Sequence, residues 1–288
     1  SQDAVLYLIP SHKLASNGND NFTGTTRDST KWGPSDHIYG AGRFSRNGKL
    51  FYYTQGSTTS EDWALHQWHA QSLPYNEDWA VQADVNIPAH TMSPDSSASV
   101  GLLLNNQADP DDNCQFSLKR EENAGTLSHG FDLMLDVNDH TVVSQKGTNP
   151  TTSAAVRYHW NSATQTLRIE YDADGPVGGY NWITLRSVAL NSGSTNWEMN
   201  SNSAFIISTG GISSNVAITV ADNVWLDNFS ITGYPPSITT HPTSQNVAKN
   251  SNVTFSVDVN GTGLNYQWQK DGVNLDGDHN GTLLLNSV

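Results

Sequence analysis

The sequence predicts an all-β protein whose main part is an antiparallel two-sheet sandwich of the jelly-roll kind. Short runs of alternating apolar and polar residues recur along most of the chain, and a period of two is typical of strands with one buried face. Loops rich in Gly, Asn, Asp, Ser and Pro separate these runs. About a dozen strands over roughly 230 residues suit two packed sheets.

The expected strands share this alternation and are bounded by turn residues. They cover residues 49–55, 79–87, 98–106, 114–121, 129–137, 154–160, 166–174, 181–188, 203–210 and 215–222. Residues 154–174 resemble a hairpin with a turn at "NSATQ". The one segment that favours a helix is "TSEDWALHQWHA" (59–70), with Ser60 as its cap.

Composition and charge narrow the classes of partner. The formal net charge is −14, so the surface repels nucleic-acid phosphates and anionic lipid. Divalent cations and neutral polymers fit such a surface better, although acidity also simply increases solubility. Cys114 is the single cysteine, which excludes an internal disulfide. No run of 18 or more apolar residues occurs, so no membrane span is expected.

A domain boundary is expected after the stretch "VWLDNFSITGYPP" (224–236). Pro235 and Pro236 remove two backbone donors and end the strand, and the composition changes after them. We therefore expect domains at 1–233 and 237–288, joined by a linker at 234–236. In a regular strand, Asp227 lies on the same face as Trp225, Phe229 and Ile231, opposite Leu226.

The segment after the prolines resembles the first part of a bacterial immunoglobulin-like domain. "NVTFSVDV" (252–259) is similar to strand B, "LNYQWQKDG" (264–272) to strand C with Trp268 as the core tryptophan, and "GTLLLNSV" (281–288) to strand E. Val257 stands where the family often has its first cysteine. The last strands of the family are missing, which implies a piece of a longer protein and a truncated Ig-like sandwich. Such a segment could pair with another chain by strand donation.

The larger part resembles the concanavalin A-like lectin/glucanase superfamily, which includes laminin G-like domains. The motifs are "DNFTGTTRDSTKWG" (20–33), the hairpin "GRFSRNGKLFYY" (42–53) and the closing strand "VWLDNFSI" (224–231). The resemblance covers residues 20–233 and implies a secreted sandwich that binds or cleaves carbohydrate.

The resemblance also implies a structural calcium ion. In many members, the aspartate of the last strand and groups near the first strand hold Ca²⁺, which takes six to eight oxygen ligands. The matching residues here are Asp20, Asn21, Gly42 (through its carbonyl) and Asp227. The alternative is that Asp227 caps a loop or pairs with an arginine.

Catalytic signatures are weak. Hydrolases of this fold carry two glutamates on one strand face, and this pattern is missing. Asp132 and Asp136 are the nearest candidates, and ordinary solvent-facing or loop residues are the better explanation of them. For a lyase, Arg157 and His159 share one strand face.

Two possible metal sites also have simpler explanations. His66 and His69 would meet only on a helix, and no third ligand is identifiable. Asp109, Asp111 and Asp112 concentrate in the loop 108–115 without the EF-hand pattern.

Tryptophans in polar loops are the best candidates for stacking on sugar rings. The candidates are Trp63, Trp68, Tyr180 and Trp182. Core packing is the competing explanation for each, since Trp is usually buried.

Three hypotheses follow. The first is an extracellular, calcium-stabilised, carbohydrate-binding module of a larger secreted or cell-surface bacterial protein. The second is a polysaccharide hydrolase or lyase on the same fold, for which the support is analogy. The third is a structural or adhesive module that self-assembles through its incomplete Ig-like segment.

Overall fold

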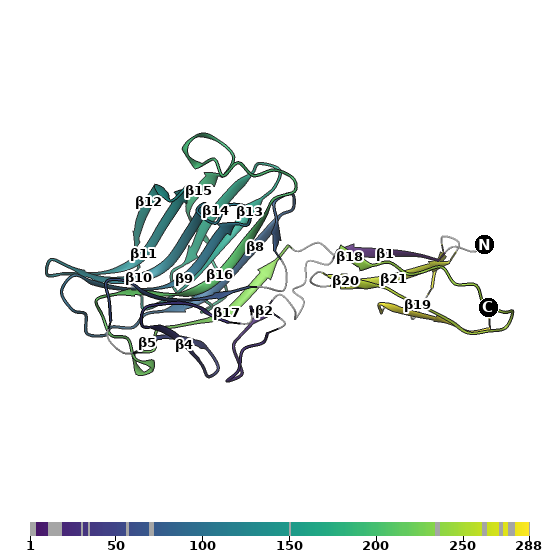
Figure 1. The fold of residues 1–288 in the computed structure, drawn as a ribbon, viewed down its shortest axis with the longest axis horizontal. Coiled ribbons are helices and arrows are strands. Elements are labelled where there is room, and N and C mark those ends of the chain that lie inside the picture. Colours follow the sequence, from purple (N-terminus) through teal and green to yellow (C-terminus); the bar gives the residue numbers. More distant parts are fainter. Residues whose placement is uncertain are drawn as a thin grey trace. The chain divides into compact units, whose positions relative to one another are not determined.

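Strands make up both parts of the protein. A computed structural model describes residues 4–10, 19–29, 31–33, 35–55, 58–68, 72–149, 151–233, 237–260, 264–270, 273–275 and 280–287. The chain forms two compact units (Figure 1), Asp20–Ile231 and a smaller unit of Ser1–Asn19 with Thr232–Val288. The prediction of an all-β sandwich is confirmed. In the described part of the chain, no helix has the length and apolar character needed to cross a bilayer.

The first of the two large sheets is called the front sheet. Its strand order is β12-β11-β10-β9-β16-β6-β3, and β7 also pairs with β16. All pairs are antiparallel. The strands are β3 (His37–Tyr39), β6 (Asp62–Gln67), β7 (Leu73–Pro74), β9 (Ser96–Asn106), β10 (Asn113–Asn123), β11 (Thr126–Val137), β12 (His140–Thr148) and β16 (Ala204–Ser214).

The second sheet, called the back sheet, has the order β15-β14-β13-β8-β17-β5-β4, with β2 paired to β17. Its strands are β2 (Asn19–Asp20), β4 (Gly42–Arg46), β5 (Leu50–Thr54), β8 (Trp79–Asn86), β13 (Ser153–Asn161), β14 (Thr166–Asp172), β15 (Ile183–Ala189) and β17 (Trp225–Thr232).

Alternation along each strand decides which side chains enter the core. On β9, Ala98, Val100, Leu102 and Leu104 are buried. Tyr158 of β13 links the two sheets, because its hydroxyl lies 3.1 Å from the Leu102 carbonyl oxygen. The intervening residues of β9 therefore face outward, and this outward face of the front sheet carries the site described below.

The smaller unit includes a strand from the beginning of the chain. Residues Ala4–Pro10 (β1) pair antiparallel with Leu264–Lys270 (β21) over seven positions. Trp268, Val257 and Leu283 form its buried core. The other strands are β18 (Ser237–Thr240), β19 (Val253–Ser256), β20 (Asp258–Asn260), β22 (Val273–Asn274) and β23 (Thr282–Leu285). The Ig-like character of this unit stays a prediction.

The beginning of the chain belongs to the same compact unit as its end. Residues 1–19 group with residues 232–288 and not with the large sandwich, because β1 is hydrogen-bonded to β21. The expected domain limits stay a prediction, and the expected linker 234–236 lies outside the described residues.

The helix expected over 59–70 is wrong. Residues Asp62–Gln67 form strand β6, in which Asp62, Ala64 and His66 are buried and the residues between them are partly exposed. Pairing with both β16 and β3 supplies the backbone hydrogen bonds of this segment. His69 lies outside the described residues, and the helical His66–His69 pair loses its basis.

The strand expected over 215–222 is also wrong. Strand β16 ends at Ser214, and a 3-10 turn follows at Val220–Asp222. The Asp222 carboxylate accepts the Thr219 backbone N–H at 2.7 Å, which satisfies a donor at the start of this turn.

Strand β17 is irregular at Asn228, where φ is +48°. This left-handed residue interrupts the alternation. Leu226, Phe229 and Ile231 are therefore all buried, while Asp227 is only partly buried. The expectation that Asp227 shares a face with Phe229 and Ile231 is wrong.

Candidate functional site

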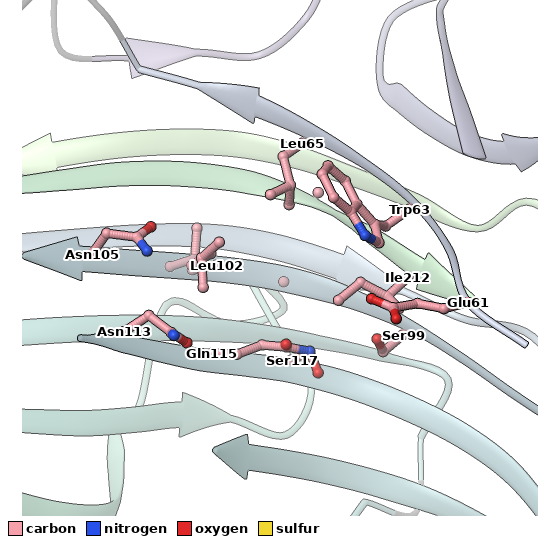
Figure 2. A pocket seen from close by; sticks show the side chains of 13 residues that line it. Glu61, Trp63, Leu65, Ser99, Leu102, Asn105, Asn113, Gln115, Ser117 and Ile212 are labelled. Carbon is pink, nitrogen blue, oxygen red and sulfur yellow. The ribbon is translucent and has the colours of Figure 1, made fainter. Parts of the chain in front are cut away.

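A groove of about 240 Å³ lies on the outward face of the front sheet (Figure 2). Strands β6, β16, β9 and β10 supply most of its lining. Side chains at paired positions of these neighbouring strands lie next to one another and form rows across the sheet. The lining residues are Glu61, Trp63, Leu65, Ser99, Gly101, Leu102, Leu103, Asn105, Asn113, Gln115, Ser117, Gly210 and Ile212.

The floor of the groove is low because two glycines face each other. Gly210 of β16 pairs with Gly101 of β9, and Gly101 pairs with Ser117 of β10. A Cβ atom at Gly101 would lie 2.2 Å from the Phe116 carbonyl oxygen, and one at Gly210 would lie 2.3 Å from the Ala64 carbonyl oxygen. Both positions therefore require glycine, and a path without large side chains crosses the sheet.

Ser117 is the polar group of this floor. Its side chain is buried, at 2% exposure, and lines the groove. Its Oγ has no hydrogen-bond partner among the described residues. A buried hydroxyl without a partner costs free energy, so this atom is suited to bonding a ligand.

Aromatic rings form one wall of the groove. Trp63 of β6 faces outward because β6 alternates, and the ring of Tyr39 from β3 stacks on it at 5.8 Å with an interplanar angle of 16°. Tyr39 is 55% exposed. The paired rings give a rigid, partly apolar surface beside a polar floor.

Asp62 fixes the start of the strand that carries Trp63. Its carboxylate is fully buried and accepts the backbone N–H groups of Ala41 and Thr59, each at 2.8 Å. Burial acts to raise the pKa of Asp62, but these hydrogen bonds outweigh it and hold the pKa below its usual value. The carboxylate therefore stays ionised and ties β6 to the turn before β4.

Carboxamides form the opposite wall. Asn105 of β9 pairs in register with Asn113 of β10, and Gln115 lies two residues further along β10. The Asn105 side chain donates to the Pro110 carbonyl at 3.0 Å, which orients its amide oxygen. Asn and Gln present donor and acceptor together, as a hydroxyl-rich ligand requires.

A group of charged residues continues the groove over β10, β11 and β12. It consists of Lys119, Glu121, Asp132 and Lys146 and is called the ionic cluster. Lys119 Nζ lies 2.9 Å from Asp132 and 3.1 Å from Glu121, and Lys146 also pairs with Glu121. A second hollow of about 140 Å³ is lined by these four residues.

Contacts within the ionic cluster keep Glu121 and Lys119 charged. Burial acts to raise the pKa of Glu121, yet Lys146 and Lys119 outweigh it and lower the pKa. Burial acts to lower the pKa of Lys119, and Asp132 and Glu121 outweigh it and raise the pKa. At neutral pH the cluster therefore has two positive and two negative charges, with little net charge.

The geometry bears on hydrolysis. The distances from Lys119 place the contacting oxygens of Asp132 and Glu121 no more than 6.0 Å apart, an upper bound that includes the roughly 5–5.5 Å of retaining glycosidases. Such enzymes need one carboxyl group to stay protonated as an acid. The lowered pKa of Glu121 opposes that role. Asp132 and Asp136 do share a face, but Asp132 is bonded to Lys119.

The four predicted stacking residues are not brought together. Trp63 lines the groove. The prediction for Trp68 is wrong, because Trp68 is 5% exposed and packs edge-on against Trp32 at 5.1 Å. Its ring therefore offers no surface to a sugar.

Tyr180 and Trp182 lie at the back sheet, away from the groove. Their rings stack on each other at 5.1 Å, and the Arg157 guanidinium lies 4.2 Å from the Trp182 ring centre. The Trp182 ring has only two faces, and the Tyr180 ring and the Arg157 guanidinium already contact it. The Tyr180 hydroxyl donates to the buried carboxylate of Asp84 at 3.0 Å.

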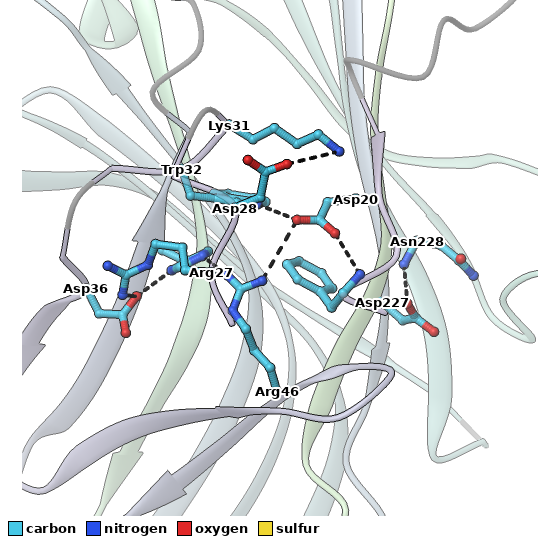
Figure 3. Close-up of polar contacts among 11 residues, drawn as sticks. Asp20, Arg27, Asp28, Lys31, Trp32, Asp36, Arg46, Asp227 and Asn228 are labelled. Carbon is cyan, nitrogen blue, oxygen red and sulfur yellow. Dashed lines mark hydrogen bonds and ion pairs between the residues drawn. The ribbon is translucent and has the colours of Figure 1, made fainter. Parts of the chain in front are cut away.

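Three of the four residues predicted to bind calcium have other partners, and those of Asp20 and Asp227 can be followed in Figure 3. Asp20 accepts the Phe22 backbone N–H at 2.7 Å and the Trp32 indole N–H at 2.6 Å, and Arg46 lies 3.9 Å from it. The Gly42 carbonyl accepts a hydrogen bond from Arg43 at 2.7 Å. Asn21 is exposed.

Asp227 faces Lys49, whose Nζ is 3.8 Å from its carboxylate and 3.0 Å from the centre of the Trp225 ring. Burial raises the pKa of Asp227, and the nearby charge of Asp20 adds to this effect. Asp20 and Gly42 already accept hydrogen bonds, and the calcium site formed by the four residues stays a prediction. Within the described ranges, no group of three or more His, Cys, Asp or Glu side chains could hold a metal ion.

The remaining candidates have structural partners. His66 is buried, with Asp36 at Nδ1 and Arg46 at Nε2. His159 contacts Arg168, and Arg157 pairs with Glu170 at 2.5 Å. Asp112 of the acidic loop is buried and accepts the Asn138 backbone N–H at 3.1 Å.

Sequence reasoning missed most of the groove. Tyr39 lies on β3, whereas Ser117 and Lys119 lie on β10, and only the register of the sheet places them near Trp63. The one local signal was the outward alternation of Ser, Gly and amide residues on expected strands.

No family model and no curated protein matches this chain. Solved structures with a similar arrangement include the carbohydrate recognition domain of Emp47p (10% identity, 78% of this chain, 99% of that one, TM-score 0.43). Another is lectin II from Ulex europaeus (14% identity, 70% of this chain, 95% of that one, TM-score 0.39). A third is the GH43 protein BlXynB from Bacillus licheniformis (11% identity, 78% of this chain, 41% of that one, TM-score 0.43). Because identities and TM-scores are this low, no activity of this chain follows from these similarities.

Proposed function

We propose that the front-sheet groove binds a carbohydrate and that the large unit acts as a lectin-like module. The observation that carries this proposal is the path over Gly210, Gly101 and Ser117, which runs between an aromatic pair and a row of carboxamides. A flat sugar ring has an apolar face for stacking and hydroxyls for hydrogen bonds. The groove offers partners for both.

Trp63 is the stacking residue in this proposal. Tyr39 supports its ring from one side, so little side-chain entropy is lost on binding. The carboxamides of Asn105, Asn113 and Gln115 orient the sugar through its hydroxyl groups. The competing explanation is that Trp63 and Tyr39 only cover the edge of the sheet.

The test is binding to a panel of immobilised neutral and acidic polysaccharides by the whole chain. We expect Trp63→Ala to weaken binding at least about tenfold, or 1.4 kcal/mol. The matched control is Trp182→Ala at the back sheet, which should bind as the parent does. Equal loss in both variants, or no binding to any polysaccharide by the correctly folded parent, would exclude the groove.

Hydrolysis is the second candidate, and the proximity of Asp132 and Glu121 favours it. Release of reducing ends from a bound polysaccharide, abolished by Asp132→Asn, would establish it. We expect no release, because Glu121 is held ionised by two lysines.

A structural calcium ion stays part of the proposal through Asp227. The support is its half-buried carboxylate, whose pKa is raised and whose contact with Lys49 is long. The measurement is thermal unfolding with calcium against excess chelator, with Asp227→Asn as control. Identical melting curves in calcium and chelator would remove the calcium proposal.

We also propose that this module belongs to a secreted or cell-surface bacterial protein with further domains in the same chain. The support is the acidic composition and the sequence resemblance. Fractionation of the source cells would test it. Self-association has less support, because β1 of the same chain already pairs with the β21 edge that a donated strand would use.

A further inference from the structure

The groove does not end at its aromatic wall. Its first hollow and the hollow at the ionic cluster adjoin through register-paired residues, Ser99 with Lys119 and Ser117 with Asp132. Glu121 lines this second hollow and also a third one, of about 210 Å³, together with Asp95 and Ser97. One track therefore crosses the sheet from Trp63 to Lys146.

The track is long compared with one sugar ring. Trp63 is on β6 and Lys146 is on β12, and the order β6-β16-β9-β10-β11-β12 contains five steps between strands. At about 4.8 Å per step, the track measures roughly 24 Å. A chain of several sugar residues fits this length, whereas a single terminal sugar would occupy only one end.

We infer that the ionic cluster is a second sugar subsite, which binds an internal residue of an uncharged polysaccharide whose chain extends along the track to Trp63. This inference rests on the proposed function and specifies its ligand. Its basis is the continuity of the hollows, the bonding state of the cluster and the unpartnered Ser117 hydroxyl between the two subsites.

The bonding state of the cluster selects hydroxyl groups over anions. An ammonium has three donors, and Lys119 directs two toward Asp132 and Glu121. Each carboxylate has acceptor sites left for a sugar hydroxyl. Because both lysines are neutralised by carboxylates, a uronate or sulfate ester would meet about as much repulsion as attraction.

Hydrogen bonds to charged groups are stronger than those between neutral groups. Loss of the Lys119 contact should therefore weaken long-chain binding by about tenfold or more. A disaccharide placed on Trp63 does not reach Lys119 and should be unaffected. Dependence on chain length thus separates the second subsite from the first.

The experiment is calorimetric titration of the whole chain with disaccharides and hexasaccharides of cellulose, xylan, mannan and β-1,3-glucan, and with oligogalacturonate. The variants are Lys119→Met, Ser117→Ala and Lys146→Met, with Lys49→Met on the back sheet as the control. We expect the parent to bind a neutral hexasaccharide at least about tenfold more tightly than its disaccharide. Lys119→Met should lose that gain.

Ser117→Ala guards against misfolding of the lysine variant, since it removes one oxygen atom that has no partner. It should weaken hexasaccharide binding several-fold with a melting temperature no lower than that of the parent, because the removed hydroxyl is buried without a partner. If affinity depends on Trp63 but not on chain length or Lys119, the second subsite is refuted while the proposed function survives. Preference for oligogalacturonate would also refute it, and binding of no sugar would refute both.

Discussion

Removing the carboxylate of Asp62 should loosen the strand that carries Trp63. Asp62 is fully buried and accepts two backbone N–H groups, from Ala41 and Thr59, at 2.8 Å each. Asp62→Ala leaves the Ala41 N–H in the core without a partner, while water can reach the exposed Thr59. Substitution of Asp62 therefore tests whether the groove depends on a residue that does not contact the ligand.

The magnitude follows from these two bonds. A buried donor left unsatisfied costs about 1–3 kcal/mol, and a hydrogen bond to a charged group contributes about 1.5–3 kcal/mol. Partial replacement by water at Thr59 reduces the sum, so we expect a loss of about 2–4 kcal/mol. For a unit of this size, about 1 kcal/mol shifts the melting temperature by roughly 2–4 °C. Asp62→Asn keeps an acceptor oxygen and should lose less.

The assay is urea unfolding of the whole chain followed by tryptophan fluorescence, with Glu61→Ala as the control at the adjacent exposed position. The pH dependence gives a second readout. Since the folded-state pKa of Asp62 is lowered, its stabilisation is present above the unfolded-state pKa of about 3.9 and is lost as pH falls through the folded-state pKa. Asp62→Ala should flatten this acid limb. An unfolding midpoint equal to that of the parent would refute the anchoring role.

Three further predictions concern other parts of the molecule. Trp68→Ala should destabilise the large unit by about 3–5 kcal/mol, because a buried tryptophan leaves a cavity, whereas Trp63→Ala should cost far less in urea unfolding. Burial lowers the pKa of His66, with Arg46 adding to the effect and Asp36 opposing it, so stability should fall as pH drops below about 6.5. His66→Gln should reduce that change between neutral and mildly acidic pH. Deletion of residues 1–10 should lower the amide-exchange protection of β21 and leave the front sheet unchanged, and equal protection in both chains would contradict the β1–β21 pairing.

The fold could be predicted because most strands show their alternation in plain apolar residues. Strand β6 could not, since its buried face consists of Asp62, Ala64 and His66. Two polar residues and a small one hide a period of two, and the segment then resembles an amphipathic helix. The partners that make these residues acceptable in the core come from other strands and loops.

The groove was only partly predictable for a related reason. Trp63 and Trp182 look alike in the sequence, since each stands beside polar residues, yet they belong to different sheets. Sheet assignment and register are long-range properties. The face of the strand on which Asp227 lies was predicted wrongly because of Asn228, whose positive φ reverses the alternation. Asn adopts this conformation more readily than most residues.

The pairing of β1 with β21 has a mechanical consequence. Both flanking segments of the large sandwich, β1 and the strands after Thr232, belong to one unit. A pulling force applied between residue 4 and residue 285 is therefore carried first by the hydrogen bonds of the smaller unit. The sandwich is under no tension until β1 separates from β21. In single-molecule stretching, the smaller unit should extend first, and the glycan groove should keep its shape up to that force.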